Sequence, residues 1–224
     1  MTTAAQKNVA PPSALRLILT LAVAGLLSGV AIIGIYESTL PTITANKARE
    51  LREAVFKVLP GVTDMQALVH RDGALVVVPE PAKDEPVVYG GYDEQGEFVG
   101  FAMPGAGPGF QDTIALLYGY KPAEQIVVGM EILASRETPG LGDKIYKDAV
   151  WVAGFSALSV DPEIVAVKKG TAAAANEIDA ITGATISSKA VVRIINETHT
   201  AWQARLPAPG SEPELVETES GSDQ

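Results

Sequence analysis

The sequence predicts an α+β fold, with an N-terminal transmembrane helix followed by one extracytoplasmic domain that has an antiparallel sheet and packed helices. Three observations predict it. A run of 20 residues without a charge lies near the N-terminus. Short runs of β-branched and aromatic residues, separated by turn residues, follow this run. The chain shows no regular alternation of strands and helices, which a parallel dinucleotide-binding sheet would require.

The uncharged run, residues 17–36, is predicted to cross the membrane. At about 1.5 Å per residue it spans ~30 Å, the thickness of a bilayer's hydrocarbon core. Lys7 and Arg16 precede it and Glu37 follows it. The positive-inside rule therefore places residues 1–16 in the cytoplasm and the main domain on the outer side of the cell inner (plasma) membrane. The alternative is a cleaved signal peptide, but its apolar region would be unusually long and no small-x-small cleavage site precedes Glu37.

Residues 37–206 are predicted to form the extracytoplasmic domain, and residues 207–224 a disordered acidic tail. The domain opens with a helix that Pro60-Gly61 ends, either as a spacer from the membrane or packed on the sheet through one apolar face. That face carries Leu51, Val55, Val58 and Leu59. Strand pairs are expected around turns at Asp72-Gly73, Gln95-Gly96 and Lys121-Pro122. A last, amphipathic helix is expected to begin near Ser187 or Ser188.

Composition narrows the possible chemistry. The chain has 224 residues, a formal net charge of −10, no cysteine and two histidines. The acidic balance argues against nucleic acid as a partner. Without cysteine the chain cannot form iron–sulfur clusters or thiolate zinc sites, and two distant histidines give no basis for a metal site. We expect no catalytic acid, base or nucleophile, so any redox chemistry would need a bound organic cofactor.

The chain has two glycine-rich stretches, and they predict different features. The stretch PGAGPGF (104–110) lacks the Gly-Lys-Ser/Thr ending of a phosphate loop, and we interpret it as a flexible hairpin connection. In RETPGLGDKI (136–145) the glycines allow backbone to approach a ligand. Polar residues flank that turn: Glu137 and Thr138 before it, and Asp143 and Lys144 after it.

The stretch DAITGATISSKAVVRII (179–195) places small residues at a helix entrance. A helix N-terminus carries partial positive charge and free N–H groups, so it favours phosphate. Gly183 and Ala184 leave room for a bulky group, and the Thr185 hydroxyl lies where a phosphate would be stabilised. From these residues alone, the alternative is that Ser187 or Thr185 merely caps the helix.

Together, DAITGAT and ETPGLGDKI resemble the FMN-binding subunits of membrane redox complexes. These are the G subunit of Rnf-type ion-translocating ferredoxin:NAD⁺ oxidoreductases and the related C subunit of sodium-translocating NADH:quinone oxidoreductase. Family members carry FMN covalently, through a phosphoester to the last threonine of a Ser/Thr-Gly-Ala-Thr motif, which here is Thr185. The motif that a flavin transferase reads is matched by Asp179, Thr182, Gly183, Ala184 and Thr185. The family loop near the flavin corresponds to Glu137, Thr138, Pro139, Gly140, Leu141 and Gly142.

The resemblance implies an electron-transfer subunit without independent turnover. Its partners would be the other subunits of a membrane complex that couples electron flow between ferredoxin and NAD⁺ to Na⁺ or H⁺ transport. Glu137, Thr138 and Lys144 are the candidates for hydrogen bonds or charge near the flavin. Two alternatives remain: a stand-alone anchored flavoprotein that serves another extracytoplasmic reductase, and a non-redox anchored scaffold.

Overall fold

The computed structural model describes residues 13–82 and 85–216. The chain divides into two compact units, Met1–Arg49 and Glu50–Gln224, and the first helix contributes to both. The helices are α1 (Ala14–Val58), α2 (Lys144–Lys147), α3 (Ala149–Ala153) and α4 (Thr185–Gln203). The strands are β1 (Asp64–Arg71), β2 (Ala74–Val78), β3 (Val87–Tyr92), β4 (Phe98–Pro108), β5 (Thr113–Lys121), β6 (Ile126–Ala134), β7 (Leu158–Ser159), β8 (Val165–Val167) and β9 (Glu177–Asp179).

Helix α1 contains the predicted membrane segment. By length and composition it is the one helix of the described residues that could cross a membrane, with a mean hydropathy of 2.5 over its apolar window. None of that window is buried, unlike the core helix of a soluble protein. The helix that we predicted after the membrane segment is part of α1, which continues to Val58.

The sheet of the second unit is antiparallel, as predicted, with strand order β2-β1-β3-β4-β5-β6-β7. The three predicted turns connect β1 to β2, β3 to β4 and β5 to β6. The first is a two-residue turn in which Asp72 has φ 52° and Gly73 has φ 84°, the positive values that short hairpins need. The strands β8 and β9 form a separate parallel pair, which we did not expect from the sequence.

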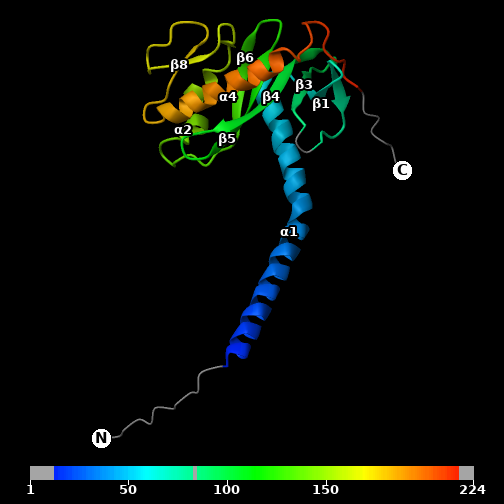
Figure 1. Cartoon of the computed structure of the whole chain (residues 1–224). Helices are drawn as coiled ribbons and strands as arrows, with labels where there is room; N and C mark the ends of the chain where they lie inside the picture. Colours follow the sequence, from blue (N-terminus) through cyan, green and yellow to red (C-terminus); the bar gives the residue numbers. More distant parts are fainter. Residues whose placement is uncertain (1–12, 83–84, 217–224) are drawn as a thin grey trace. The chain divides into compact units, whose positions relative to one another are not determined.

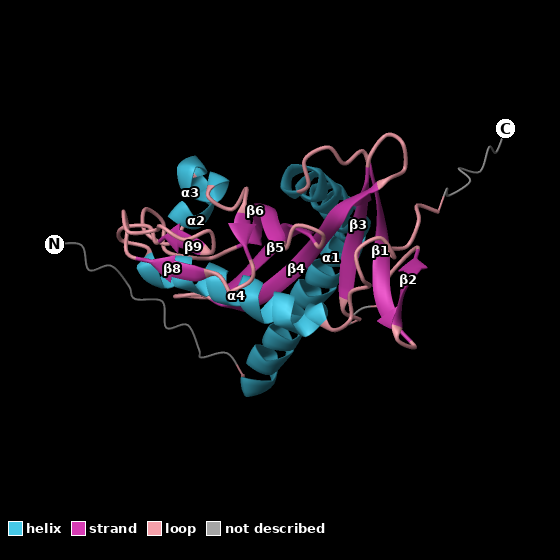
Figure 2. Cartoon of the chain, turned by 90° about the horizontal axis from the view of Figure 1, so that it is seen from above, coloured by secondary structure: helices cyan, strands magenta, loops and turns pink. Residues whose placement is uncertain are grey.

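Helical residues cover both faces of this sheet. On one face, residues 50–58 of α1 pack with Leu117 and Ala102. They come so close that a Cβ added at Gly119 would overlap the Val58 carbonyl oxygen. On the other face lies α4, which runs beside β4 in Figures 1 and 2. The part of the predicted helix that belongs to the second unit therefore packs on the sheet through its apolar face, which is one of the two predicted arrangements.

The stretch 104–110 differs from its prediction. Residues 104–108 belong to β4, and the hairpin connection begins at Gly109. Added Cβ atoms at Gly105 and Gly107 would each lie 2.9 Å from side-chain carbons of Ile194 on α4. Gly105 and Gly107 are therefore explained by the close approach of α4 to the strand, and not by a turn of the chain.

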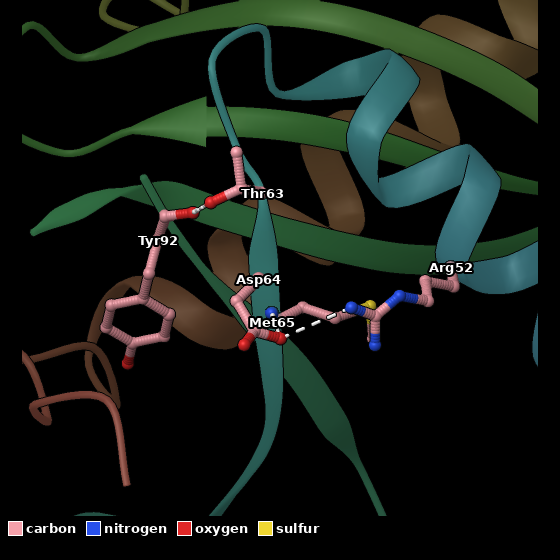
Figure 3. A network of polar contacts seen from close by, with 5 residues as sticks. All are labelled: Arg52, Thr63, Asp64, Met65 and Tyr92. Carbon is pink, nitrogen blue, oxygen red and sulfur yellow. Dashed lines mark hydrogen bonds and ion pairs between the residues drawn. The ribbon is translucent and has the colours of Figure 1, made fainter. Parts of the chain in front are cut away.

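Two polar networks tie the start of the domain together. Figure 3 shows the first, where the hydroxyl and N–H of Thr63 donate to the Tyr92 carbonyl oxygen and Arg52 pairs with Asp64 at 3.4 Å. In the second, the side-chain amide of Gln66 donates to the Glu214 carbonyl oxygen and accepts from the Val216 N–H.

The second network bears on the predicted tail. The Tyr92 hydroxyl donates to the Pro213 carbonyl oxygen at 2.6 Å. Residues 213–216 are thus hydrogen-bonded to the sheet, which differs from the disorder that their composition predicts. Residues 217–224 of the predicted tail, and residues 1–12 of the predicted cytoplasmic segment, lie outside the described residues.

Candidate functional site

A pocket of about 290 Å³ lies where three segments meet: the β4–β5 connection, the 137–142 loop and the first turn of α4. Its lining residues are Phe110, Thr138, Leu141, Gly142, Gly183, Ala184, Thr185, Ile186 and Ser187. The structure therefore brings together the two stretches that the sequence singled out, although 42 positions separate Gly142 from Ala184.

The Thr-Gly-Ala-Thr stretch forms a tight turn that leads directly into α4. Gly183 has φ 84°, and the nearest atom to a Cβ added there is a Leu141 methyl group at 3.7 Å. The helix begins at Thr185, two or three residues earlier than predicted. Its N-cap residue is Ala184, which gives the helix no side-chain cap. The interpretation of Thr185 or Ser187 as a cap is therefore wrong.

Ser188 is the polar residue that holds this turn. Its hydroxyl is fully buried, donates to the Ala184 carbonyl oxygen at 2.9 Å and accepts from the Ile181 N–H at 3.1 Å. The Thr185 hydroxyl lies 3.5 Å from the Ile181 carbonyl oxygen, and Thr185 is exposed. The turn is thus fixed from its buried side, while the Thr185 hydroxyl stays accessible from the pocket.

The 137–142 loop contributes Thr138, Leu141 and Gly142 to the pocket. The Thr138 hydroxyl donates to the Gln111 side-chain oxygen at 2.8 Å, which joins the loop to the β4–β5 connection. Pro139 and Gly140 are exposed and do not line the pocket.

Glu137 is buried behind the pocket and does not line it. One carboxylate oxygen accepts from the N–H groups of Phe110 and Gln111, each at 2.9 Å, and the other accepts from the Ser187 hydroxyl. Burial raises the pKa of Glu137, but these hydrogen bonds outweigh it, so the pKa lies below its ordinary value. Glu137 is therefore an anion in the folded protein at neutral pH.

Lys144 places a cation beside the Thr-Gly-Ala-Thr turn. Its ammonium group lies 3.5 Å from the Thr182 carbonyl oxygen and 3.8 Å from the position of a Cβ on Gly183. The neighbouring Asp143 is buried and accepts from Lys147 at 2.7 Å, a bond that holds the pKa of Asp143 below its usual value. Lys147 is thus paired with Asp143, while Lys144 faces the turn.

Asp179 lies apart from the pocket, at the end of β9. Its carboxylate accepts from the N–H groups of Thr171 and Ala172 at 3.1 and 3.0 Å, and its carbonyl oxygen accepts from the Trp151 indole N–H at 2.8 Å. Backbone hydrogen bonds, that of Ala172 foremost, lower its pKa. In the fold, Asp179 fixes the strand that enters the turn at 182–185.

The sequence did not predict two of the three large apolar side chains that line the pocket. Phe110, Leu141 and Ile186 are large side chains that are 62%, 51% and 57% exposed, and all three line the pocket. Only Leu141 was among the predicted site residues. Phe110 and Ile186 could have been suspected, because each is a large apolar residue beside a glycine-rich or small-residue turn.

This arrangement can bind a molecule that has both an anionic end and a flat apolar body. The uncapped N-terminus of α4 and Lys144 suit a phosphate. The exposed apolar side chains suit a planar ring. The chain's own groups thus fit a flavin phosphate such as FMN.

Comparison with known proteins agrees with this assignment. Residues 109–199 match the family model described as the FMN-binding domain. The chain is 36% identical over 152 residues to the G subunit of the Na⁺-translocating ferredoxin:NAD⁺ oxidoreductase complex of Acetobacterium woodii, covering 66% of this chain and 71% of that protein. It is 32% identical over 180 residues to the G subunit of the ion-translocating oxidoreductase complex of Escherichia coli, covering 75% of this chain and 84% of that protein.

The fold also has a solved counterpart. The crystal structure of Shewanella oneidensis NqrC superposes with a TM-score of 0.56 at 18% identity, over 68% of this chain and 91% of that chain. At that identity the likeness shows a shared fold only. The matched FMN-binding region begins at the β4–β5 connection and ends within α4, so it contains every lining residue of the pocket.

Proposed function

We propose that this chain, which belongs to the family of G subunits of ion-translocating oxidoreductase complexes, is an electron-transfer subunit that carries one FMN in the pocket at the start of α4. The observation that carries the proposal is that the exposed Thr185 hydroxyl and the uncapped N-terminus of α4 lie at one pocket, with the Lys144 ammonium group beside the turn that enters the helix. The bound flavin would supply the capacity to accept and release electrons, and the chain would supply its placement and its electrostatic surroundings.

Thr185 is proposed to hold the flavin phosphate through a phosphoester. The hydroxyl is accessible, lies in the first helical turn and has one weak internal partner at 3.5 Å. A phosphate joined to this oxygen would stay beside the N–H groups of the first turn, which stabilise negative charge. Gly183 and Lys144 would flank the phosphate, with Gly183 leaving room and Lys144 contributing positive charge.

The attachment would be made by a flavin transferase, which would move the flavin phosphoryl group from a flavin dinucleotide to the Thr185 oxygen. The phosphoanhydride bond of the donor would break, a nucleoside monophosphate would leave, and the Thr185 hydroxyl would lose its proton. The target motif of the transferase would be Asp179 together with Thr182, Gly183, Ala184 and Thr185. The carboxylate of Asp179 is engaged by two backbone N–H groups of the folded chain. A transferase that acts on the folded domain would therefore meet the turn already shaped, with Thr185 presented at the pocket.

The chain is proposed to work as one part of a membrane complex. The apolar segment of α1 would anchor it in the cell inner membrane, with the domain outside. Electrons would reach and leave the flavin through the other subunits, and the complex would couple their flow between ferredoxin and NAD⁺ to Na⁺ or H⁺ transport. No residue lining the pocket needs to act as an acid or base on a diffusing substrate.

Intact-mass analysis of the full chain, produced with and without a flavin transferase, tests the proposal. We expect an added mass of one FMN less one water only when the transferase is present, and no addition in Thr185→Val. Thr200→Val, which changes an exposed threonine of α4 outside the motif, is the matched variant and should retain the adduct. An unchanged adduct in Thr185→Val, or none in the wild-type chain with the transferase present, would refute the covalent link.

Asp179 separates two ways in which the transferase could recognise the chain. Asn can still accept from the N–H groups of Thr171 and Ala172, whereas Ala cannot. If the shaped turn is what matters, Asp179→Asn should be modified and Asp179→Ala should not. Loss of the adduct in both variants would indicate that the transferase reads the charge of Asp179 itself.

A further inference from the structure

The carboxylate of Glu137 joins the three segments that form the pocket. It reaches the β4–β5 connection through the N–H groups of Phe110 and Gln111, and α4 through the Ser187 hydroxyl. Glu137 itself begins the third segment, the 137–142 loop. Each of these segments contributes side chains to the pocket wall, but Glu137 contributes none.

Two glycines leave the space that this carboxylate occupies. A Cβ added at Gly109 would lie 2.5 Å from one carboxylate oxygen of Glu137, and a Cβ added at Gly142 would lie 2.6 Å from the other. Neither distance is compatible with a side chain while the carboxylate is in place, and a Cβ at Gly109 would also lie 2.8 Å from the Asp112 carbonyl oxygen. Neither glycine has a positive φ that would explain its presence by backbone conformation. Their absent side chains therefore match the position of Glu137.

The geometry leaves Glu137 with little capacity to bind a ligand directly. Its residue surface is only 5% exposed, and both oxygens accept hydrogen bonds from the chain. The charge is stabilised where it lies, because two backbone N–H groups and one hydroxyl donate to it. By contrast Phe110, held through its own N–H, presents an exposed ring to the pocket.

We propose that Glu137 is a positioning residue, which holds the Phe110 wall and the first turn of α4 at a fixed separation so that the pocket is formed before a flavin is attached. It acts through Phe110, Gln111 and Ser187 and does not touch the flavin. The proposal rests on the proposed function only in naming the occupant of the pocket. The hydrogen bonds of Glu137 to Phe110, Gln111 and Ser187 form in the chain without a cofactor.

The first test uses the full chain in detergent, produced without a flavin transferase. Hydrogen exchange of the Phe110 and Gln111 amides is followed by mass spectrometry in wild type, Glu137→Ala and Glu137→Gln. Exchange should be about tenfold faster in Glu137→Ala, because both amides lose their acceptor. It should stay near the wild-type rate in Glu137→Gln, since the amide oxygen still accepts and its NH₂ can donate to Ser187. Glu94→Ala, which removes an exposed carboxylate from the β3–β4 turn, is the matched control and should match wild type.

The second test uses the same variants produced with the transferase. In Glu137→Ala the FMN adduct should remain on the chain, while the induced visible circular dichroism and fluorescence anisotropy of the flavin fall. Glu137→Gln should restore both signals. A merely structural role would lower the melting temperature and leave these two flavin signals unchanged.

Three results would overturn the proposal. One is wild-type exchange of the two amides in Glu137→Ala, and another is wild-type flavin dichroism in that variant. The third is loss of the flavin signals in Glu137→Gln with the amides still protected, which would mean that the charge acts on the flavin directly. If Glu137→Ala does not fold, Gly142→Ala decides, because its Cβ displaces the carboxylate and should speed the same exchange. A wild-type chain without any adduct would refute the proposed function. The hydrogen-exchange result would still test whether Glu137 positions the pocket walls.

Discussion

Two buried tyrosines offer a matched test of how hydrogen bonds stabilise this domain. Tyr118 on β5 and Tyr92 on β3 are both fully buried. The Tyr118 hydroxyl has no hydrogen-bond partner among the described residues. The Tyr92 hydroxyl donates to the Pro213 carbonyl oxygen at 2.6 Å and accepts from Gln66 at 2.5 Å. The same substitution, Tyr→Phe, should therefore have opposite effects at the two positions.

The magnitudes follow from these contacts. Removing a buried hydroxyl without a partner relieves a penalty of about 1–3 kcal/mol, so Tyr118→Phe should raise the free energy of unfolding by about 1 kcal/mol. Tyr92→Phe removes two hydrogen bonds of about 1 kcal/mol each and should lower that free energy by about 2 kcal/mol. Burial raises the pKa of Tyr118, and it raises the pKa of Tyr92 to about 12. Both hydroxyls are thus protonated at neutral pH, and ionisation does not contribute to the difference.

Urea unfolding of the full chain in detergent, followed by tryptophan fluorescence, measures both variants. The expected separation is about 3 kcal/mol with an unchanged m value. A Tyr118→Phe variant that is less stable than wild type would refute the reasoning, because it would show that the hydroxyl has a partner. Equal losses in the two variants would refute it as well.

Two further predictions concern the packing of α1 and a half-buried histidine. Gly119→Ala should lower the free energy of unfolding by about 3 kcal/mol, because its Cβ would overlap the Val58 carbonyl oxygen. Gly96→Ala, at a position with open space but φ 79°, should lower it by about 1–2 kcal/mol. Equal losses for the two variants in urea unfolding would contradict this account. Burial lowers the pKa of His199, so the unfolded chain binds its proton more readily and stability should fall as the pH drops through about 6.5. His199→Gln should reduce that dependence when urea midpoints are compared at about pH 7.5 and 5.5, and an unchanged dependence would assign it to another group.

The sequence predicted those parts of the fold that depend on neighbouring residues. The Asp72-Gly73 hairpin is one, since a short turn with positive φ at both positions needs such residues. The stretch 104–108 was misjudged because its glycines serve a distant element, α4, and local composition cannot separate close packing from a turn. The contacts of residues 213–216 with Gln66 were not predicted either, because the two segments are far apart in the sequence.

The residues of the candidate site also fall into two groups: those that a local motif predicts and those that only the fold brings together. The residues of the 182–185 turn share one motif, so sequence alone brought them together, and the structure places Thr185 at the pocket. Phe110 comes from another hairpin, and only the folded sheet brings it to that pocket. Ser188 looks like any helix serine in the sequence, yet its buried hydroxyl fixes the turn.

Helix α4 connects the stability of the domain to the geometry of the site. Ile194 lies against Gly105 and Gly107 of β4 so closely that the helix has little freedom to slide along the strand. Ser188 and Ser187 then tie its first turn to the 181–184 turn and to Glu137. Because a helix is stiff, fixing it at the strand also fixes where its N-terminus lies. The position of Thr185 is therefore set by the packing of α4 against the central strand β4 as much as by the motif around it. A cofactor joined to that residue would be attached to a rigid part of the domain.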